Sequence, residues 1–432
     1  MKKLLYLSLL CCFALFPGVQ AKTSATVKNE KVFILDESAP GNKENAVIVS
    51  PDCKYGVSGN SYGYEFNTAP ATGKPYFFSV DLPEGNFNVK VLLGGKKNSC
   101  TTIKAESRRL MVESITTKAG EYATYEFAVN LRNKYIGKSD SVRLKAREFT
   151  KLNWDNKLTL EFNGVNPSVA RIEIAPTTDL ITVFLAGNST VVDQDEEPWC
   201  GWGQMIPRFF TNRVAIANYA ESGEAANSFV SAKRLAKLLT VMKEGDYLFI
   251  EFGHNDEKQK GEGVGPYTTY KANMKVLVDE ARKKGGIPVL VTSMHRRSFD
   301  ENGKVINTHG DFPDAVRLLA KEEKVALIDL TNMSAILYEA WGPEKSKRAF
   351  VHYPAGTYPN QDKPLADNTH FNSYGGYQIM HCILKGISDL KLPLCQYLRD
   401  DYRMFDPAHP DDFNSFSMPA TPFSSFVKPD GN

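Results

Sequence analysis

One serine in this sequence follows a predicted buried strand directly. Residues 181–186 form a run of six apolar and β-branched residues, which predicts a strand inside a sheet. The next four residues, 187–190, are Gly-Asn-Ser-Thr and are typical of a turn. Ligands of open parallel sheets bind outside the carboxyl ends of the strands. The turn therefore presents Ser189 to a substrate, and Ser189 is a candidate nucleophile.

Three further polar segments offer the partners that a serine nucleophile needs. Residues 221–224 and 253–256 follow the second and third predicted strands, and residues 367–372 lie near the C-terminus. The last segment contains His370, a candidate base, because a histidine can take up a serine proton near neutral pH. It also contains Asp367, an acid that can reach the other ring nitrogen of that histidine. Each segment alone is common in proteins. Their order and their placement at strand ends are far more specific.

Taken together, these segments resemble the blocks of SGNH (GDSL-type) hydrolases, and most of all those of the rhamnogalacturonan acetylesterase branch. The resemblance covers roughly residues 180–392. Four segments carry it, namely residues 187–190, 218–223, 253–256 and 367–370. One residue departs from the pattern, because Asn188 stands where the family usually has Asp. The turn thus keeps a hydrogen-bonding side chain but not its charge.

The resemblance implies a role for each matching residue. Ser189 would be the nucleophile, His370 the base and Asp367 its partner. The oxyanion hole would consist of the Ser189 N–H, the Gly223 N–H and the side-chain amide of Asn255. No metal or organic cofactor is expected, and the sequence has no Cys-x-x-Cys or His-Glu-x-x-His spacing that would indicate a zinc site.

The expected activity is that of a serine carbohydrate esterase, which removes O-acetyl groups from a plant polysaccharide. Pectic rhamnogalacturonan is the expected substrate, through the same resemblance. Two alternatives remain. One is an esterase of this family that acts on another acetylated glycan or on a lipid. The other is a non-catalytic carbohydrate-binding protein with a degenerate hydrolase fold.

Three residues are candidates for binding the substrate. Arg296 and Arg297 follow the fourth predicted strand, and a guanidinium group pairs well with a carboxylate such as that of galacturonate. Surface ion pairs are an equally good interpretation of these arginines. Trp199 lies shortly after the nucleophile and is a candidate wall for stacking on a sugar. Ser222 is a rival nucleophile by position, but it has no matching block and is assigned to a turn.

A second serine motif lacks the flanking strand and helix that it needs to form a nucleophile site. Residues 59–63 fit Gly-x-Ser-x-Gly around Ser61, a motif that requires a hydrophobic strand before it and a helix after it. The flanking residues 53–58 and 64–67 predict neither. Ser61 is therefore expected to be a loop serine.

The chain divides into four predicted parts. Residues 1–21 resemble a signal peptide, and residues 22–176 show short alternating strands that predict a β-sandwich, with a weak resemblance to galactose-binding-like modules. Such a module would bind sugar or pack against its neighbour. Residues 177–400 alternate strands and helices, which predicts a three-layer α/β/α sandwich around a parallel sheet of about five strands. Residues 401–432 are a Pro-rich and Phe-rich tail, expected to wrap a folded domain.

The leader and the composition bear on location and partners. Residues 1–21 predict export to the periplasm or the medium, with a lipoprotein anchor at Cys11 or Cys12 as the weaker alternative and no stable membrane insertion. The net charge of +2 falls to about zero once Lys2 and Lys3 are removed with the leader, because that leader contains no acidic residue. A neutral chain disfavours nucleic acid as a partner.

The mature chain would retain five cysteines. An odd number leaves at least one of them as a free thiol. Cys53 with Cys100, and Cys382 with Cys395, are possible pairs, but neither pairing follows from the sequence.

Overall fold

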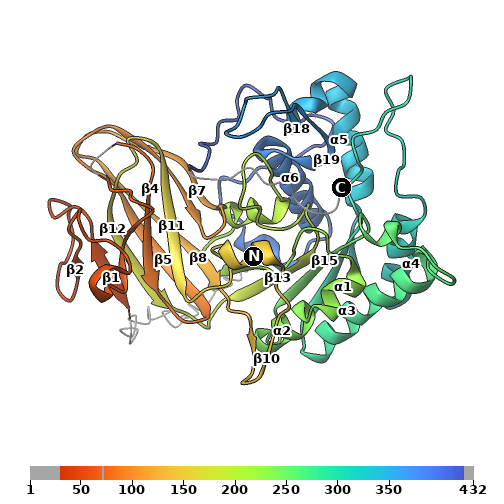
Figure 1. The fold of residues 1–432 in the computed structure, drawn as a ribbon, viewed down its shortest axis with the longest axis horizontal. Helices are drawn as coiled ribbons and strands as arrows, with labels where there is room; N and C mark the ends of the chain where they lie inside the picture. The colour runs from red at the N-terminus through yellow and green to blue at the C-terminus, as the bar shows by residue number, and fades with distance from the viewer. Residues whose placement is uncertain (1–29, 71–72, 423–432) are drawn as a thin grey trace, which may run out of the picture.

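Strands fill the N-terminal part of the protein (Figure 1, left). The computed structural model describes residues 30–70 and 73–422, so the predicted signal peptide lies outside the described residues. Two five-stranded sheets have the orders β2-β1-β12-β5-β8 and β3-β4-β11-β6-β7. Their strands are β1 (Lys31–Ile34), β2 (Val47–Ile48), β3 (Tyr62–Glu65), β4 (Tyr76–Asp81), β5 (Gly85–Gly94), β6 (Ser99–Ala105), β7 (Arg109–Thr117), β8 (Tyr122–Leu131), β11 (Lys157–Val165) and β12 (Val169–Pro176).

Alternating side chains hold the two sheets together as a sandwich. In β5, for example, Val89, Val91 and Leu93 are buried, while Lys90 between them is exposed. The buried residues join Phe78 and others from the second sheet in one hydrophobic core. The predicted β-sandwich is therefore confirmed, and we refer to it as the β-module. After β8 the chain forms the short pair β9 (Tyr135–Ile136) and β10 (Asp140–Ser141) and the 3₁₀ turn η3 (Ala146–Thr150).

The C-terminal part is built on a parallel sheet with the order β14-β13-β15-β16-β17. Its strands are β13 (Ile181–Gly187), β14 (Val214–Asn218), β15 (Tyr247–Glu251), β16 (Ile287–Val291) and β17 (Ala326–Ile328). The helices are α1 (Ala226–Ser231), α2 (Arg234–Val241), α3 (Lys271–Lys283), α4 (Phe312–Glu323), α5 (Leu330–Lys345) and α6 (Ser373–Asp389).

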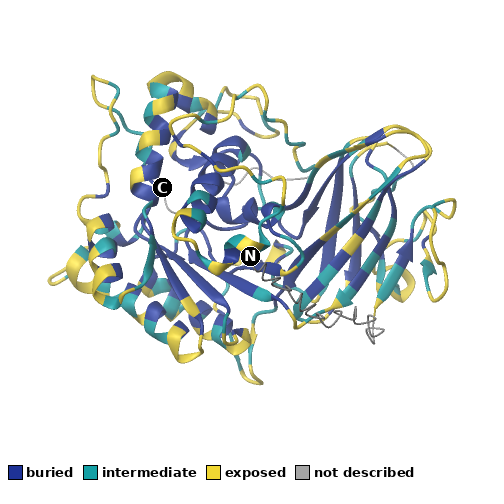
Figure 2. Ribbon diagram, turned by 180° about the vertical axis from the view of Figure 1, so that it is seen from behind, coloured by how far each residue is buried: buried dark blue, intermediate teal, exposed yellow. Residues whose placement is uncertain are grey.

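Successive residues of the parallel strands face opposite helical layers. Phe184 packs in one core with residues of α1 to α4, whereas its neighbours Val183 and Leu185 pack in a second core with residues of α5 and α6. The two helical layers lie on opposite sides of the sheet (Figure 1), and the strands between them are buried (Figure 2). The predicted α/β/α sandwich of five parallel strands is thus confirmed.

The β-module packs directly against the parallel sheet. Strand β8 lies beside β14, and the Asn86 side-chain amide donates a hydrogen bond of 2.9 Å to the Thr182 hydroxyl. Arg108, in the turn between β6 and β7, and Arg109, the first residue of β7, reach into the other part, where Arg109 pairs with Asp193 at 3.2 Å. These contacts favour the packing interpretation of the module.

The C-terminal segment, described as far as residue 422, contacts both parts of the protein. The ring of Phe413 lies 4.3 Å from that of Tyr374, measured between centroids, and Phe416 packs on Tyr377. Further on, the Thr421 hydroxyl donates to Glu161 of the β-module at 2.7 Å. The tail therefore spans both parts of the protein.

The described cysteines form no disulfide. Cys53, Cys100, Cys200, Cys382 and Cys395 are all free, so the two possible pairings are not formed. Among residues 30–70 and 73–422, we find no helix with the length and apolar character needed to cross a membrane.

Candidate active site

Strand β13 ends in a tight turn that carries Ser189. Gly187 is required just before it, because a Cβ atom there would lie 2.5 Å from Cγ2 of Val191. The Asn188 side-chain oxygen accepts hydrogen bonds from the backbone N–H of Thr190 at 3.0 Å and from its hydroxyl at 2.9 Å. Asn188 thus supplies the hydrogen-bonding function of the turn without a charge.

The imidazole of His370 bridges Ser189 and Asp367. Its Nε2 lies 2.7 Å from the Ser189 Oγ, and its Nδ1 lies 2.8 Å from the Asp367 Oδ2. A carboxylate only accepts hydrogen bonds, so Nδ1 carries the proton and Nε2 is left to accept the proton of the serine hydroxyl. Segments 181 residues apart in sequence therefore meet with the geometry of a serine hydrolase relay.

A short hairpin holds the acid and the base in place. Asp367 lies in strand β19 (Leu365–Phe371), which pairs with β18 (Phe350–Tyr353). The Asp367 Oδ1 accepts from the N–H groups of Thr369 at 2.9 Å and His370 at 3.0 Å. Burial would raise the pKa of Asp367, but the hydrogen bond and charge of His370 and these N–H groups outweigh it and hold the pKa well below its usual range.

Hydrogen bonds connect the turns that carry the proposed oxyanion donors. Gly223 has φ of 78° in the turn after β14, a conformation that favours glycine. The Gln194 side-chain amide donates to the Ser189 carbonyl at 2.7 Å and lies 3.4 Å from the Ser222 hydroxyl, which links the two turns. The Asn255 side-chain amide donates to the Glu224 carbonyl at 3.0 Å, which connects it to the segment that contains Gly223. Its part in an oxyanion hole stays a prediction.

A sequence model of the GDSL-like lipase/acylhydrolase family matches residues 161–376, which is half of the chain. The chain belongs to this family. As a member of it, the protein is a carboxylic ester hydrolase. The match begins inside β11 of the β-module and ends in the first turns of α6.

Named relatives cover the same share of the chain. The rhamnogalacturonan acetylesterase RhgT of Bacillus subtilis is 45% identical over 220 residues, which are 50% of this chain and 94% of that protein. The probable rhamnogalacturonan acetylesterase YesY of the same species is 36% identical over 217 residues, 50% of this chain and 95% of that protein. The rhamnogalacturonan acetylesterase of Emericella nidulans is 26% identical over 244 residues, 51% of this chain and 90% of that protein.

Within this acylhydrolase, the two candidate arginines contact protein groups. Arg296 forms an ion pair with Glu257 and lies 3.3 Å from the carbonyl oxygen of His254. Arg297 donates to the Ser346 hydroxyl at 2.9 Å and to the Asn368 side-chain oxygen at 3.0 Å. These contacts agree with the ion-pair interpretation, and a contact with a substrate carboxylate stays a prediction.

The prediction for Trp199 is wrong. Its side chain is fully buried, at 0% exposure, so it offers no face to a sugar. Its backbone carbonyl accepts a hydrogen bond of 2.8 Å from Arg108 of the β-module. The residue lies in the interface between the two parts of the protein. The sequence around Trp199 does not show that this interface exists.

Sequence reasoning also missed several cations next to the site. Lys145, Arg147 and Lys151 come from η3 and its flanks in the β-module and contact the turn that contains Ser222. They lie at least 70 residues before that turn in the sequence, and no motif indicates that they contact it. Among the described residues, no group of three or more His, Cys, Asp or Glu side chains forms a metal site.

Proposed function

We propose that this protein is an exported carbohydrate acetylesterase that removes O-acetyl groups from pectic rhamnogalacturonan. Two kinds of observation support the proposal. The relatives RhgT and the Emericella nidulans enzyme are named rhamnogalacturonan acetylesterases, and the chain spans at least 90% of their length. The observation that carries the chemistry is the pair of contacts of His370, at 2.7 Å from Ser189 and 2.8 Å from Asp367.

The first half-reaction transfers the acetyl group to the enzyme. The Ser189 Oγ attacks the acetyl carbonyl carbon while His370 Nε2 takes the hydroxyl proton. Negative charge collects on the former carbonyl oxygen, where the N–H groups of Ser189 and Gly223 and the Asn255 amide stabilise it. The bond between the acetyl carbon and the sugar oxygen then breaks, and His370 returns its proton to that oxygen. The sugar hydroxyl leaves, and acetyl-Ser189 remains.

The second half-reaction releases acetate. Water attacks the acetyl carbon, and His370 removes one of its protons. When the bond to the Ser189 Oγ breaks, His370 gives the proton back to that oxygen. Asp367 stays ionised throughout, because its pKa lies well below the usual range, and it stabilises the imidazolium that forms in each half.

A fluorophosphonate that labels activated serines tests the nucleophile. We expect the wild-type protein to be labelled once and Ser189→Ala to resist labelling. Ser222→Ala is the matched control, because Ser222 is a buried serine on the adjacent turn, and this variant should still be labelled. Labelling that survives Ser189→Ala, or an unlabelled wild type, contradicts the serine mechanism and favours a non-catalytic binding protein.

Acetate release tests the substrate. We expect faster release from acetylated rhamnogalacturonan than from acetylated xylan at equal acetyl concentration. Equal rates on both, or a preference for xylan or for a lipid ester, would assign the enzyme to another acetylated substrate.

Export rests on the composition of residues 1–21. We expect the mature chain to begin at Lys22, which N-terminal sequencing of the protein produced in a bacterial host would show. A mature protein that retains Met1 in the cytoplasm contradicts export.

A further inference from the structure

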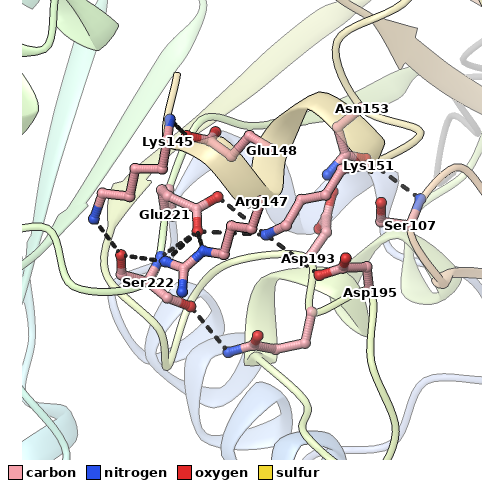
Figure 3. Close-up of polar contacts among 12 residues, drawn as sticks. Ser107, Lys145, Arg147, Glu148, Lys151, Asn153, Asp193, Asp195, Glu221 and Ser222 are labelled. Atoms are coloured by element: carbon pink, nitrogen blue, oxygen red, sulfur yellow. Dashed lines mark hydrogen bonds and ion pairs between the residues drawn. The ribbon is translucent and has the colours of Figure 1, made fainter. Parts of the chain in front are cut away.

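A single carbonyl oxygen beside the active site accepts hydrogen bonds from two cations of the β-module (Figure 3). The Lys145 Nζ lies 2.6 Å from the backbone oxygen of Ser222, and an Arg147 guanidinium nitrogen lies 2.8 Å from the same oxygen. Both cations belong to the segment around η3, which lies in the β-module. The two lone pairs of this carbonyl are thus both used by charged donors.

The Ser222 carbonyl is part of the peptide group that contains the Gly223 N–H. A peptide group is planar, and in its trans form the C=O and the N–H point in opposite directions. Holding the Ser222 oxygen therefore fixes the direction of the Gly223 N–H. Hydrogen bonds to the carbonyl also polarise the peptide, so its N–H becomes a stronger donor.

We infer that Lys145 and Arg147 are positioning residues for the oxyanion hole, which act through the Ser222–Gly223 peptide. The inference rests on the proposed function, in which the Gly223 N–H is an oxyanion donor. It assigns the β-module a part in the acetyl-transfer chemistry, in addition to its packing role.

A buried carboxylate keeps Arg147 in this position. Arg147 contacts Glu221 Oε1 at 2.8 Å, and Lys151 contacts Glu221 Oε2 at 3.1 Å. Glu221 Oε1 also accepts the backbone N–H of Ser222 at 3.0 Å, so the peptide group before the Ser222 carbonyl is held as well. Figure 3 shows Arg147 directed toward both Glu221 and Ser222.

The charge of Glu221 supports this arrangement. Burial would raise the pKa of this carboxyl, but the charges of Lys151, Arg234 and Arg147 outweigh burial and hold the pKa well below its usual range. Glu221 is therefore a permanent anchor for Arg147 at the pH values at which esterases act.

Lys145 has a similar anchor. Its Nζ lies 3.1 Å from Oε1 of the buried Glu224, the residue whose carbonyl accepts from Asn255. The cations thus touch the segment 221–224 at both ends, and this segment contains the proposed donor Gly223. A change in either cation should alter the direction of that N–H.

The alternative is that these cations only tie the two parts of the protein together. In that case their loss would lower the melting temperature without changing the rate of acetyl transfer. The positioning role predicts in addition a loss of kcat at nearly unchanged KM, whatever the change in melting temperature. The two roles are therefore separable by experiment.

The first test compares two lysines of the full-length protein. Lys145→Met removes a donor to the Ser222 carbonyl, whereas Lys233→Met removes a lysine of similar exposure, 34% against 30%, that pairs with Asp140 of the β-module. With 4-nitrophenyl acetate, we expect Lys145→Met to lower kcat and kcat/KM by about 10-fold, a part of the 10²–10³ lost with a whole oxyanion donor. Lys233→Met should leave both constants within about 2-fold of wild type.

The second test uses Arg147, with a conservative replacement as its control. Arg147→Met should lower kcat by about 10-fold or more, and Arg147→Lys, which keeps a charged donor, should recover much of the loss. If Arg147→Met does not fold because Glu221 loses a partner, Lys145→Met and Arg147→Lys still decide the question.

An inhibitor that mimics the tetrahedral intermediate provides a further measurement. Its affinity would not change if the two cations only held the two parts of the protein together. Methylboronic acid adds to the Ser189 oxygen while His370 takes the serine proton, and the tetrahedral boronate places an oxygen in the oxyanion hole. Its inhibition constant should rise in Lys145→Met by the same factor as kcat/KM falls.

The outcomes separate this inference from the proposed function. If the wild type is active and labelled at Ser189 but Lys145→Met and Arg147→Met lose only melting temperature, the cations are structural and the inference is wrong. If the wild type itself is neither labelled nor inhibited by the boronate, the proposed function is wrong.

Discussion

The indole Nε1 of Trp202 donates a hydrogen bond of 2.6 Å to Oε2 of Glu251, beneath the turn that carries Ser189. The other oxygen of Glu251 lies 3.1 Å from the Thr190 hydroxyl, which itself donates to Asn188. Burial raises the pKa of Glu251 to about 7, and its hydrogen bonds with Trp202 and Thr190 offset this only in part. A neutral carboxyl fits the site, because it accepts from Trp202 and donates to Thr190.

We predict that Glu251→Gln is more stable than the wild type at pH 8. Below an ordinary pKa of 4.5, Glu251 is protonated in both the folded and the unfolded chain, and its contribution to stability is fully present. Between pH 4.5 and 7, Glu251 ionises in the unfolded chain but stays protonated in the folded one. This favours the unfolded chain, so the contribution of Glu251 to stability is lost as the pH rises. Glutamine keeps one acceptor and one donor and does not ionise. Urea unfolding from pH 4.5 to 8 should show a gain on the order of 2–3 kcal/mol at the upper end.

Glu221→Gln is the contrasting control for that prediction. The pKa of Glu221 is lowered, so its ionised form contributes stability above an ordinary pKa of 4.5 that is lost as the pH falls. This variant should therefore be less stable than the wild type at pH 8, with the difference shrinking in acid. The same sign for both variants would contradict the opposite charge states assigned here.

A second prediction concerns the acid of the relay. Asp367→Asn should lower kcat by about 10³–10⁴, because an amide in place of the carboxylate favours the wrong tautomer of His370. The melting temperature should fall as well, because the lowered pKa of Asp367 means that its ionised form stabilises the fold. The value of kcat with 4-nitrophenyl acetate, measured well below the melting temperature of the variant, gives the direct measurement.

The chain contains a matched control for Asp367. Asp406 also lies three residues before a histidine and contacts the Nδ1 of His409 at 2.7 Å, but the two side chains are 60% and 83% exposed. Asp406→Asn should leave kcat unchanged. If both variants lost activity equally, the assignment of Asp367 would be wrong.

The control also shows what sequence can and cannot decide. Apolar runs such as residues 181–186 predict the strands, and the carboxyl ends of parallel strands must share one edge of the sheet. Ser189, Gly223 and Asn255 could therefore be placed together from the sequence. The spacing Asp-x-x-His alone does not separate residues 367 and 370 from 406 and 409, because burial beside a serine depends on the tertiary fold.

Contacts between the β-module and the acylhydrolase part could not be predicted from the sequence. Lys145 and Arg147 belong to no recognisable motif, and their partner Ser222 lies at least 75 residues away in the sequence. Trp199 was wrongly placed for a related reason. An aromatic residue close to a nucleophile in the sequence can either stack on a sugar or be buried in an interface. The sequence does not show that the β-module, through Arg108, covers Trp199.

A third prediction tests this interface through Arg108. Its guanidinium is buried and donates to the carbonyls of Gln194, Glu196 and Trp199 at 3.1, 3.0 and 2.8 Å, and it pairs with Glu197 at 2.7 Å. Arg108→Met should lower the free energy of unfolding by about 3–5 kcal/mol, because it leaves Glu197 as a buried charge without its main partner. Denaturant unfolding measures the change.

A double variant checks the cause of that loss. In Arg108→Met with Glu197→Gln, the buried charge is gone, so part of the lost stability should return. No recovery would mean that the three carbonyl contacts, and not the ion pair, account for the role of Arg108.

The last prediction concerns the tail. Removal of residues 404–432 exposes the aromatic surface that Phe413 and Phe416 cover on Tyr374 and Tyr377. It also removes the Pro419 carbonyl and the Thr421 hydroxyl, which bond the buried Lys104 at 2.7 and 2.8 Å. We expect a lower melting temperature and new binding of the dye ANS, because a large apolar patch becomes exposed.

Single substitutions locate the source of that effect. Phe413→Ala removes a packed aromatic ring and should reproduce much of the loss, on the order of 3 kcal/mol. Met404→Ala, at a side chain that is 61% exposed, should cost less than about 0.5 kcal/mol. If the shortened chain melts like the wild type, the tail does not stabilise the fold. Equal effects of the two substitutions would show that packing on Tyr374 is not the reason.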